Sequence, residues 1–222
     1  AIQLGAMYSF YYHSFLYLSV PEVLLFTVMT PIYITLLNDA LEKHFNPKFF
    51  IIALIAVCGA LAIRYESITS NFLMGLLLVQ AANICFATGQ VTYKRLMSNT
   101  QFDHKTVFGW FFIGALIVAT LCYLLFGNTE QLPSTPTQWG VLIYLGIVAS
   151  GLGYFCWNKG ATLVNVGTLA AMNNVLIPVG IVVNVLIWNT EADILRLSIG
   201  AGIILAALLL NQINTGPSMD KI

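Results

Sequence analysis

Four long stretches of the chain contain no Asp, Glu, Lys or Arg and are mostly apolar. They cover residues 67–93, 106–128, 131–158 and 160–190. Each is longer than the roughly 20 apolar residues that a helix needs to cross a hydrocarbon core about 30 Å thick. The pattern therefore predicts membrane-spanning helices over most of the chain.

Apolar runs and the polar residues between them divide the whole sequence into eight predicted helices. These cover residues 2–18, 22–41, 48–63, 71–96, 106–127, 137–158, 166–188 and 194–212. The second and third have the shortest uncharged cores, so a re-entrant or interfacial segment is the alternative for each of them.

An internal repeat relates the two ends of the chain. Residues 11–37 and 157–186 both read as an aromatic helix end, a turn of small residues and a helix with one interior proline. The prolines are Pro31 and Pro178, which are 178 − 31 = 147 residues apart. The helices that follow the two proline helices, over residues 48–63 and 194–212, also correspond to each other. Two apolar helices can, however, resemble each other by coincidence.

The repeat predicts an all-α fold, a polytopic membrane helix bundle. Two further helices precede the second block, so symmetry predicts five helices in each half, and an odd number inverts one half relative to the other. We expect residues 1–66 to be the last three helices of the first repeat, 67–212 to be the second repeat and 213–222 to be a tail. On this interpretation eight of ten helices are present and the first two are missing.

Composition and charge support a membrane protein and give it an orientation. Hydrophobic residues make up 59% of the chain and charged residues 8%, against roughly 25% charged in a soluble domain. The net charge is zero without a basic patch, which excludes a nucleic-acid partner. Basic residues near helix ends favour the cytoplasmic side. Seven of them would lie on one side and only two, Arg64 and Arg196, on the other; the seven are Lys43, Lys48, Lys94, Arg95, Lys105, Lys159 and Lys221. This predicts a cytoplasmic C-terminus.

The repeated segments resemble a known family. The run from Tyr144 to Leu186 and its weaker counterpart from Tyr11 to Leu37 are similar to the EamA domain of the drug/metabolite transporter superfamily. The nearest resemblance is to the carboxylate, amino acid and amine branch, and within it to bacterial biotin transporters. Where the family usually has Gly-Glu-Arg after the proline helix, this chain has residues 38–42 and 189–191 instead, NDALE and NTE.

The resemblance implies secondary transport of a small metabolite across a bacterial inner membrane, with biotin uptake as one candidate. Export of amino acids, amines or related metabolites is an alternative within the same fold. A membrane-embedded lipid-handling protein or enzyme is an alternative from another class, and it would need convergent ionisable side chains. The expected partners are the solute and the lipid bilayer, with the protein as a monomer or homodimer.

Polar side chains inside the apolar helices are the candidate solute ligands, because they cost free energy in hydrocarbon unless they have partners. Gln80, Asn83 and Gln90 lie on one helical stripe that ends at Lys94. Asn173 and Asn174 lie one turn before Pro178. The stripe suits either a cavity or interhelical hydrogen bonding.

The two prolines are predicted helix breaks, because proline lacks the backbone donor and frees a carbonyl one turn earlier. Thr27 and Thr30 precede Pro31 as the two asparagines precede Pro178. A plain packing kink is the alternative for both helices.

Aromatic residues occupy corresponding positions in the two repeated segments. Tyr8, Tyr11 and Tyr12 correspond to Tyr154 and Trp157, and we expect Tyr12, Tyr154 and Trp157 to face a solute, although Tyr and Trp also form interface belts. A further candidate is His13, which could exchange protons near neutral pH or act as a hydrogen-bonded structural residue.

No catalytic motif, metal-ligand pair or phosphate-binding loop is found in the sequence. The four cysteines lie singly in apolar stretches, which indicates packing thiols. We therefore expect no catalytic residue, no bound metal and no cofactor.

Overall fold

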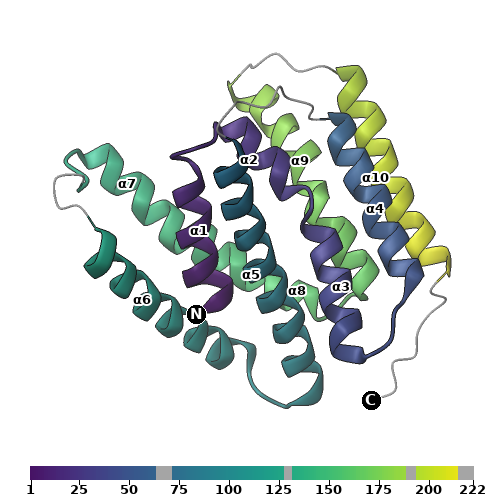
Figure 1. Ribbon diagram of the computed structural model, residues 1–222, viewed down its shortest axis with the longest axis horizontal. Helices are drawn as coiled ribbons and strands as arrows, with labels where there is room; N and C mark the ends of the chain where they lie inside the picture. The colour runs from purple at the N-terminus through teal and green to yellow at the C-terminus, as the bar shows by residue number, and fades with distance from the viewer. Residues whose placement is uncertain (64–71, 128–131, 189–193, 215–222) are drawn as a thin grey trace.

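The computed structural model describes residues 1–63, 72–127, 132–188 and 194–214, and within these ranges the chain is helical with short connections (Figure 1). Five of the described helices are long and apolar enough to cross a membrane. They cover Glu22–Glu42, Phe72–Asn99, His104–Phe126, Pro136–Ala161 and Ile194–Asn211, and two shorter apolar helices cover Pro47–Ala62 and Val166–Gly180. The protein is a polytopic helical membrane bundle.

Four of the predicted helices are continuous, with ends close to the expected positions. They are α4 (Pro47–Ile63), α5 (Phe72–Asn99), α6 (His104–Phe126) and α10 (Ile194–Asn214). A fifth, α9 (Val166–Trp188), is continuous although Pro178 lies inside it.

The other three predicted helices are interrupted. The first is a π-helical segment η1 (Ile2–Ala6) followed by α1 (Met7–Ser14), and the second divides into α2 (Val20–Thr27) and α3 (Thr30–Glu42). The sixth consists of α7 (Pro136–Tyr144), a π-helical segment η3 (Leu145–Gly153) and α8 (Tyr154–Ala161). The break at Val28 and Met29 lies just before Pro31, one of the two predicted helix breaks, whereas α9 continues through Pro178, the other.

Both segments that had a re-entrant alternative run the height of the bundle. In Figure 1, α2 and α3 together descend from one end of the bundle to the other, and α4 returns alongside α10. The re-entrant interpretation is not supported for either.

Helices that correspond in the repeat run in opposite directions. In Figure 1, α1 and α4 ascend while α8 and α10 descend, and α3 descends while α9 ascends. The arrangement matches what an inverted repeat requires.

Local geometry repeats as well. The Met7 N–H bonds to the carbonyl of Ile2, and the Tyr154 N–H bonds to that of Ala149, so the two π-helical segments end within one residue of corresponding positions. A π-helical segment at a similar position in each half is informative, because π-helical geometry is rare and is frequent at functional sites. They position Tyr8 and Tyr154, which are 154 − 8 = 146 residues apart.

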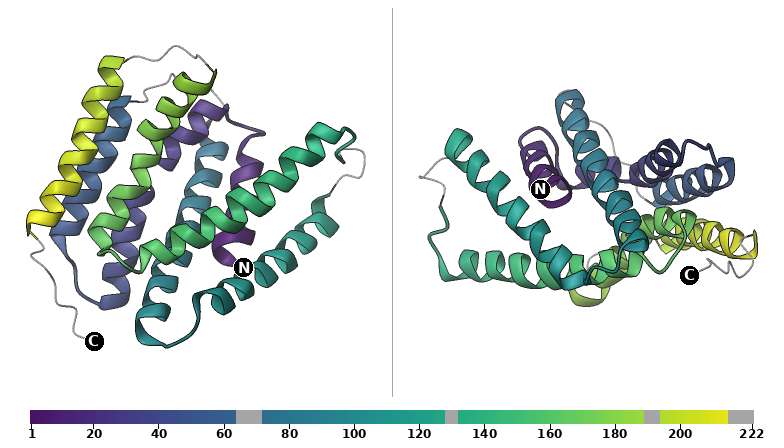
Figure 2. Two further views of the ribbon diagram at one scale, coloured as in Figure 1. Left: turned by 180° about the vertical axis from the view of Figure 1, so that it is seen from behind. Right: turned by 90° about the horizontal axis from the view of Figure 1, so that it is seen from below.

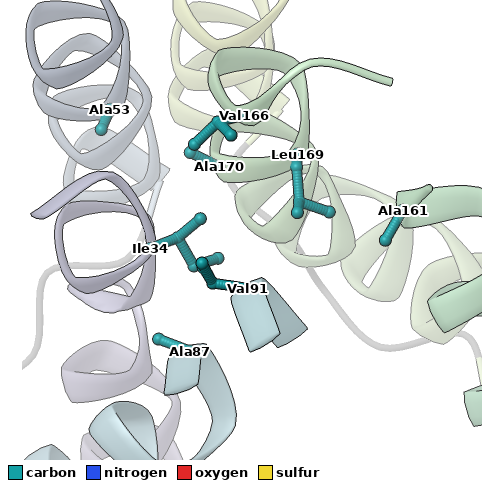
Figure 3. Packing of buried hydrophobic residues seen from close by; sticks show 8 residues of the cluster. All are labelled: Ile34, Ala53, Ala87, Val91, Ala161, Val166, Leu169 and Ala170. Atoms are coloured by element: carbon teal, nitrogen blue, oxygen red, sulfur yellow. The ribbon is translucent and has the colours of Figure 1, made fainter. Parts of the chain in front are cut away.

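Small residues let the central helices approach closely. The cluster in Figure 3 brings together α3, α4, α5 and α9 around Ala53, Ala87, Ala170 and Ile34. On the other side of α4, a side chain at Gly59 would meet the Gly200 carbonyl of α10 at 2.9 Å. Membrane helices associate through such small-residue contacts, since lipid gives no hydrophobic drive for their association.

The outer helices α6 and α7 diverge from the bundle at the side away from α4 and α10 (Figure 2). Their exposed side chains are predominantly apolar, including Trp110, Leu116, Leu124 and Ile143. In a bilayer these surfaces suit contact with lipid.

Candidate solute-binding cavity

A cavity of about 520 Å³ lies among α1, α2, α3, α5, α8 and α9, within the usual size range of small-molecule sites. Its lining is mostly apolar and aromatic, with hydroxyl and amide groups between: Met7, Tyr8, Tyr11, Leu24, Thr27, Thr30, Ala82, Asn83, Phe86, Tyr154, Trp157, Asn173, Asn174, Leu176, Ile177 and Gly180. None of these residues carries a formal charge, so the cavity can recognise a solute through hydrogen bonds, dipoles and ring faces.

The break between α2 and α3 forms one side of the cavity. Pro31 has no N–H to donate to the carbonyl of Thr27, and the Thr30 hydroxyl donates to that carbonyl instead, at 2.6 Å. The Met29 N–H bonds to the Phe26 carbonyl at 3.4 Å in a tighter turn. The proline thus leaves the carbonyl of Thr27, a residue that lines the cavity, without its usual backbone donor.

Two side-chain amides of α5 donate hydrogen bonds to the backbone carbonyl of Phe26. The Asn83 side chain donates to this carbonyl at 3.0 Å and Gln80 donates to it at 3.3 Å, while Asn83 also donates to the Gln80 carbonyl oxygen. The Tyr33 hydroxyl donates to Gln80 at 3.0 Å. Gln80 is thereby committed to interhelical bonding behind the cavity, whereas Asn83 both bonds and lines it.

The two asparagines of α9 also differ in their partners: one donates to another helix and one donates within its own helix. Asn174 donates across the bundle to the Val28 carbonyl at 3.2 Å, joining the uninterrupted proline helix to the broken one. Asn173 donates to the Leu169 carbonyl of its own helix at 2.8 Å. Both residues line the cavity, and each keeps an amide oxygen as an acceptor.

Aromatic rings form the opposite wall. The rings of Tyr8 and Tyr154 lie 6.2 Å apart, and Phe86 meets Tyr154 edge to face at 6.0 Å. The Tyr8 hydroxyl is within hydrogen-bond distance of the Ser150 hydroxyl, at 3.1 Å. Ring faces of this kind suit a flat or partly apolar solute.

The wall is built from equivalent positions of the two repeats. Tyr8 corresponds to Tyr154 and Tyr11 to Trp157, each pair 146 residues apart by the numbers above, and all four line the cavity. With the spacing of 147 that relates the prolines, Thr27 corresponds to Asn174, and both of these line it too. The cavity therefore lies at the junction of the repeats.

The structure brings five of the nine predicted ligands to the cavity: Asn83, Tyr154, Trp157, Asn173 and Asn174. Gln80 and Gln90 are not among the lining residues, and Gln90 is fully buried. Two candidates on α1 point elsewhere: Tyr12 is 57% exposed and stacks on Tyr8, and His13 is exposed with its ring 6.1 Å from Tyr17.

Several lining residues were not predicted. Phe86, Leu24, Leu176 and Ile177 are apolar, and an apolar residue on a membrane helix gives no signal that separates a cavity from lipid. Gln3, buried at the start of η1, was also missed. Gln3 carries the one side-chain amide on the first predicted helix, and this could have marked it as a candidate in the sequence.

None of the described Asp, Glu, His, Lys or Arg residues lines the cavity. Within the described residues no group of three His, Cys, Asp or Glu side chains could hold a metal ion. The carboxylate of Glu22 accepts from the Ser19 hydroxyl and N–H at the start of α2.

A helical membrane bundle with an uncharged cavity at the junction of two opposed halves defines a transporter of a small solute rather than an enzyme. Sequence comparison agrees and is more specific. The chain belongs to the EamA-like transporter family, whose pattern matches residues 73–212. The match covers the second of the two expected repeats.

Individual relatives extend the match to nearly the whole chain. A probable biotin transporter of Pseudomonas aeruginosa is 50% identical over 215 residues, which are 96% of this chain and 75% of that protein. The biotin transporters of Salmonella typhimurium and Escherichia coli are each 47% identical over 213 residues, covering 96% of this chain and 71% of theirs. A pseudopaline exporter of Pseudomonas aeruginosa is 24% identical over 96% of this chain and 74% of its own length.

A solved crystal structure has the same fold. It superimposes with a TM-score of 0.76 over 94% of this chain and 72% of the other, at 18% sequence identity. At this identity the likeness concerns the fold alone.

Proposed function

We propose that the protein imports biotin across the inner membrane of a bacterium as a secondary carrier. The observation that carries this proposal is the identity of 47–50% to proteins named biotin transporters, over 96% of this chain. No other solute is named for a relative of comparable identity among these matches.

The cavity supports the proposal chemically. Biotin combines a cyclic urea, a thioether ring and an aliphatic acid tail, so most of its surface is uncharged. Aromatic faces of Tyr154 and Trp157 suit the fused rings, while the amides of Asn83, Asn173 and Asn174 supply hydrogen bonds. We propose these five residues as ligands, together with Tyr8 and Tyr11.

The proposed architecture has two inverted repeats, residues 1–66 belonging to the first and 67–212 to the second. The proposed orientation has the loop between α1 and α2 outside, with 213–222 forming a cytoplasmic tail. The seven-to-two distribution of basic residues supports this side.

Uptake of labelled biotin by bacteria that lack their own importer tests the proposal. Cells that express the full chain should accumulate label faster than cells with an empty vector, and excess unlabelled biotin should abolish the difference. Equal accumulation in the two strains would contradict biotin import.

Export of an amino acid or amine derivative is the second candidate, and the pseudopaline exporter at 24% identity is the observation that favours it. An exporter would leave biotin accumulation unchanged. It would instead raise the tolerance of the host to the exported metabolite, which a growth assay over a panel of amines and amino acids can measure.

A further inference from the structure

Four polar residues lie together beside the cavity, and we call them the inner amide layer: Gln3, Gln90, Trp157 and Asn158. The Gln3 amide donates to the Asn158 side-chain oxygen at 3.1 Å, and both residues are buried. Gln3 packs against α5 at Gly89, where a side chain would meet its Cβ at 2.1 Å. Asn158 in turn donates to the Tyr154 carbonyl at 2.9 Å.

Contacts on either side place Gln90 in the same layer. Phe86, one turn before Gln90, meets Tyr154. Lys94, one turn after it, donates to the carbonyls of Ala161 and Val164 at the end of α8. Helices α5 and α8 run in the same direction (Figure 1). Gln90 therefore lies between these two contacts along α5, as Trp157 and Asn158 lie between them along α8.

The layer contains buried hydrogen-bonding atoms without partners among the described residues. They are both polar atoms of the Gln90 side chain, the Gln3 carbonyl oxygen and the Trp157 indole nitrogen. Two are acceptors and two are donors. Burying an amide without hydrogen bonds costs free energy, and that cost is larger where no water is at hand.

Trp157 connects the layer to the cavity, because its ring is part of the lining while its indole N–H is buried. Two amide oxygens and two kinds of N–H donor in one place complement a group that carries both N–H and C=O. A cyclic urea has two N–H donors and one carbonyl acceptor. Amide oxygens of Gln3 and Gln90 can receive its N–H groups, while Trp157 and the Gln90 amide donate to its carbonyl.

We propose that the inner amide layer is the subsite for the cyclic urea of the transported solute, in the step where that solute leaves the cavity past Trp157. The inference rests on the proposed function, since it assigns one part of biotin to one part of the protein. It predicts that recognition of the ring depends on Gln90 and Trp157.

Gln90→Leu and Trp157→Phe test the proposal, each in the full chain. Both remove unpartnered polar atoms and retain apolar bulk. We expect the apparent KM for biotin uptake to rise about tenfold in each variant, since one to two hydrogen bonds are lost. The thermal unfolding midpoint of Gln90→Leu should be unchanged or higher, because a buried amide without partners is removed.

An analogue with methylated ring nitrogens gives an independent readout. It should compete with labelled biotin at least about tenfold less well than biotin does in the wild type, and this discrimination should disappear in Gln90→Leu. Trp110→Phe, at an exposed position of α6, and Gln101→Leu, in an exposed connection, are the matched controls and should keep wild-type KM and discrimination.

Unchanged KM and unchanged discrimination in both variants would overturn the subsite while leaving biotin import intact. A lower unfolding midpoint in Gln90→Leu, with KM unaltered, would also overturn it, because the amide would then be structural. Absence of wild-type uptake would contradict the proposed function itself, so the two failures are distinguishable.

Discussion

Single side chains connect hydrogen bonding inside the membrane to the cavity. Asn83 is the clearest case, since it satisfies a carbonyl freed at the helix break and also lines the cavity. Gln80, one turn away on the same stripe, makes the same kind of bond and does not reach the cavity. One polar stripe thus contributes both to interhelical hydrogen bonding and to the cavity lining.

Replacing Asn83 by Ala should affect stability and transport at once. The Phe26 carbonyl keeps only the two longer bonds, from Gln80 and from the Met29 N–H, so the free energy of unfolding should fall by about 1 kcal/mol. Biotin uptake should fall as well, because a cavity amide is lost. Asn99→Ala, at the exposed end of α5, is the control. Thermal unfolding in detergent and uptake in cells measure the two effects, and an Asn83→Ala protein equal to wild type in both would refute this role.

Residue type and spacing identified the polar positions but did not determine which side chain faces the solute. Tyr8, Tyr11 and Tyr12 cover more than one face of α1, and packing on α5 turns the first two toward the cavity and leaves Tyr12 exposed. The sequence contains no information on that rotation without the contacts of α5. The unpartnered atoms of Gln90 could likewise be found only from the structure.

At the scale of helices, the two prolines of the repeat have different effects on helix continuity. Pro31 lies in the first turn of α3 after a break, whereas Pro178 lies inside the continuous helix α9. A sequence rule on proline predicts a break or a kink at both. The outcome differs because three amides from α5 and α9 satisfy the carbonyls before Pro31.

Substituting each proline by Ala separates these two situations. Pro31→Ala should change the free energy of unfolding by less than about 1 kcal/mol, since an N–H is not required in the first turn of a helix. Pro178→Ala should stabilise α9 by up to about 3 kcal/mol, because an interior helix bond is restored. Thermal unfolding of both variants measures the contrast, and equal effects at the two sites would contradict it.

Close packing between η1 and α5 depends on Gly89. A Cβ at this position would lie 2.1 Å from the Cβ of Gln3, so Gly89→Ala should destabilise the protein by about 1–3 kcal/mol. Gly109→Ala is the matched control, because nothing lies within 4 Å of the added carbon, and it should be neutral or slightly stabilising. If both variants unfold at the wild-type temperature, η1 does not pack against α5 as described.

At the scale of the molecule, the repeat is what made the fold predictable. Two proline helices with matching neighbours indicated opposed halves, and the equivalent helices indeed run in opposite directions (Figure 1). The two π-helical turns could not be foreseen, since a single extra residue in a helix leaves no distinctive sequence signal. They position Tyr8 and Tyr154 in corresponding ways.

The proposed orientation makes a prediction about two connections. In a background without cysteines, Ser134→Cys between α6 and α7 should react with a membrane-impermeant maleimide added to whole cells. Gln101→Cys, between α5 and α6, should react only after the cells are opened, because its neighbours include basic residues that favour the cytoplasm. The reverse pattern would contradict the orientation.

Counterflow in proteoliposomes tests biotin transport by this protein with the fewest assumptions, because it requires only a carrier and its solute and does not depend on how transport is energised. Vesicles that contain the purified full chain and are loaded with unlabelled biotin are diluted into a trace of labelled biotin. We expect a transient accumulation of label above its equilibrium level, reduced in the Asn83→Ala protein. Entry of label at the rate of protein-free vesicles, without accumulation, would contradict biotin transport by this protein.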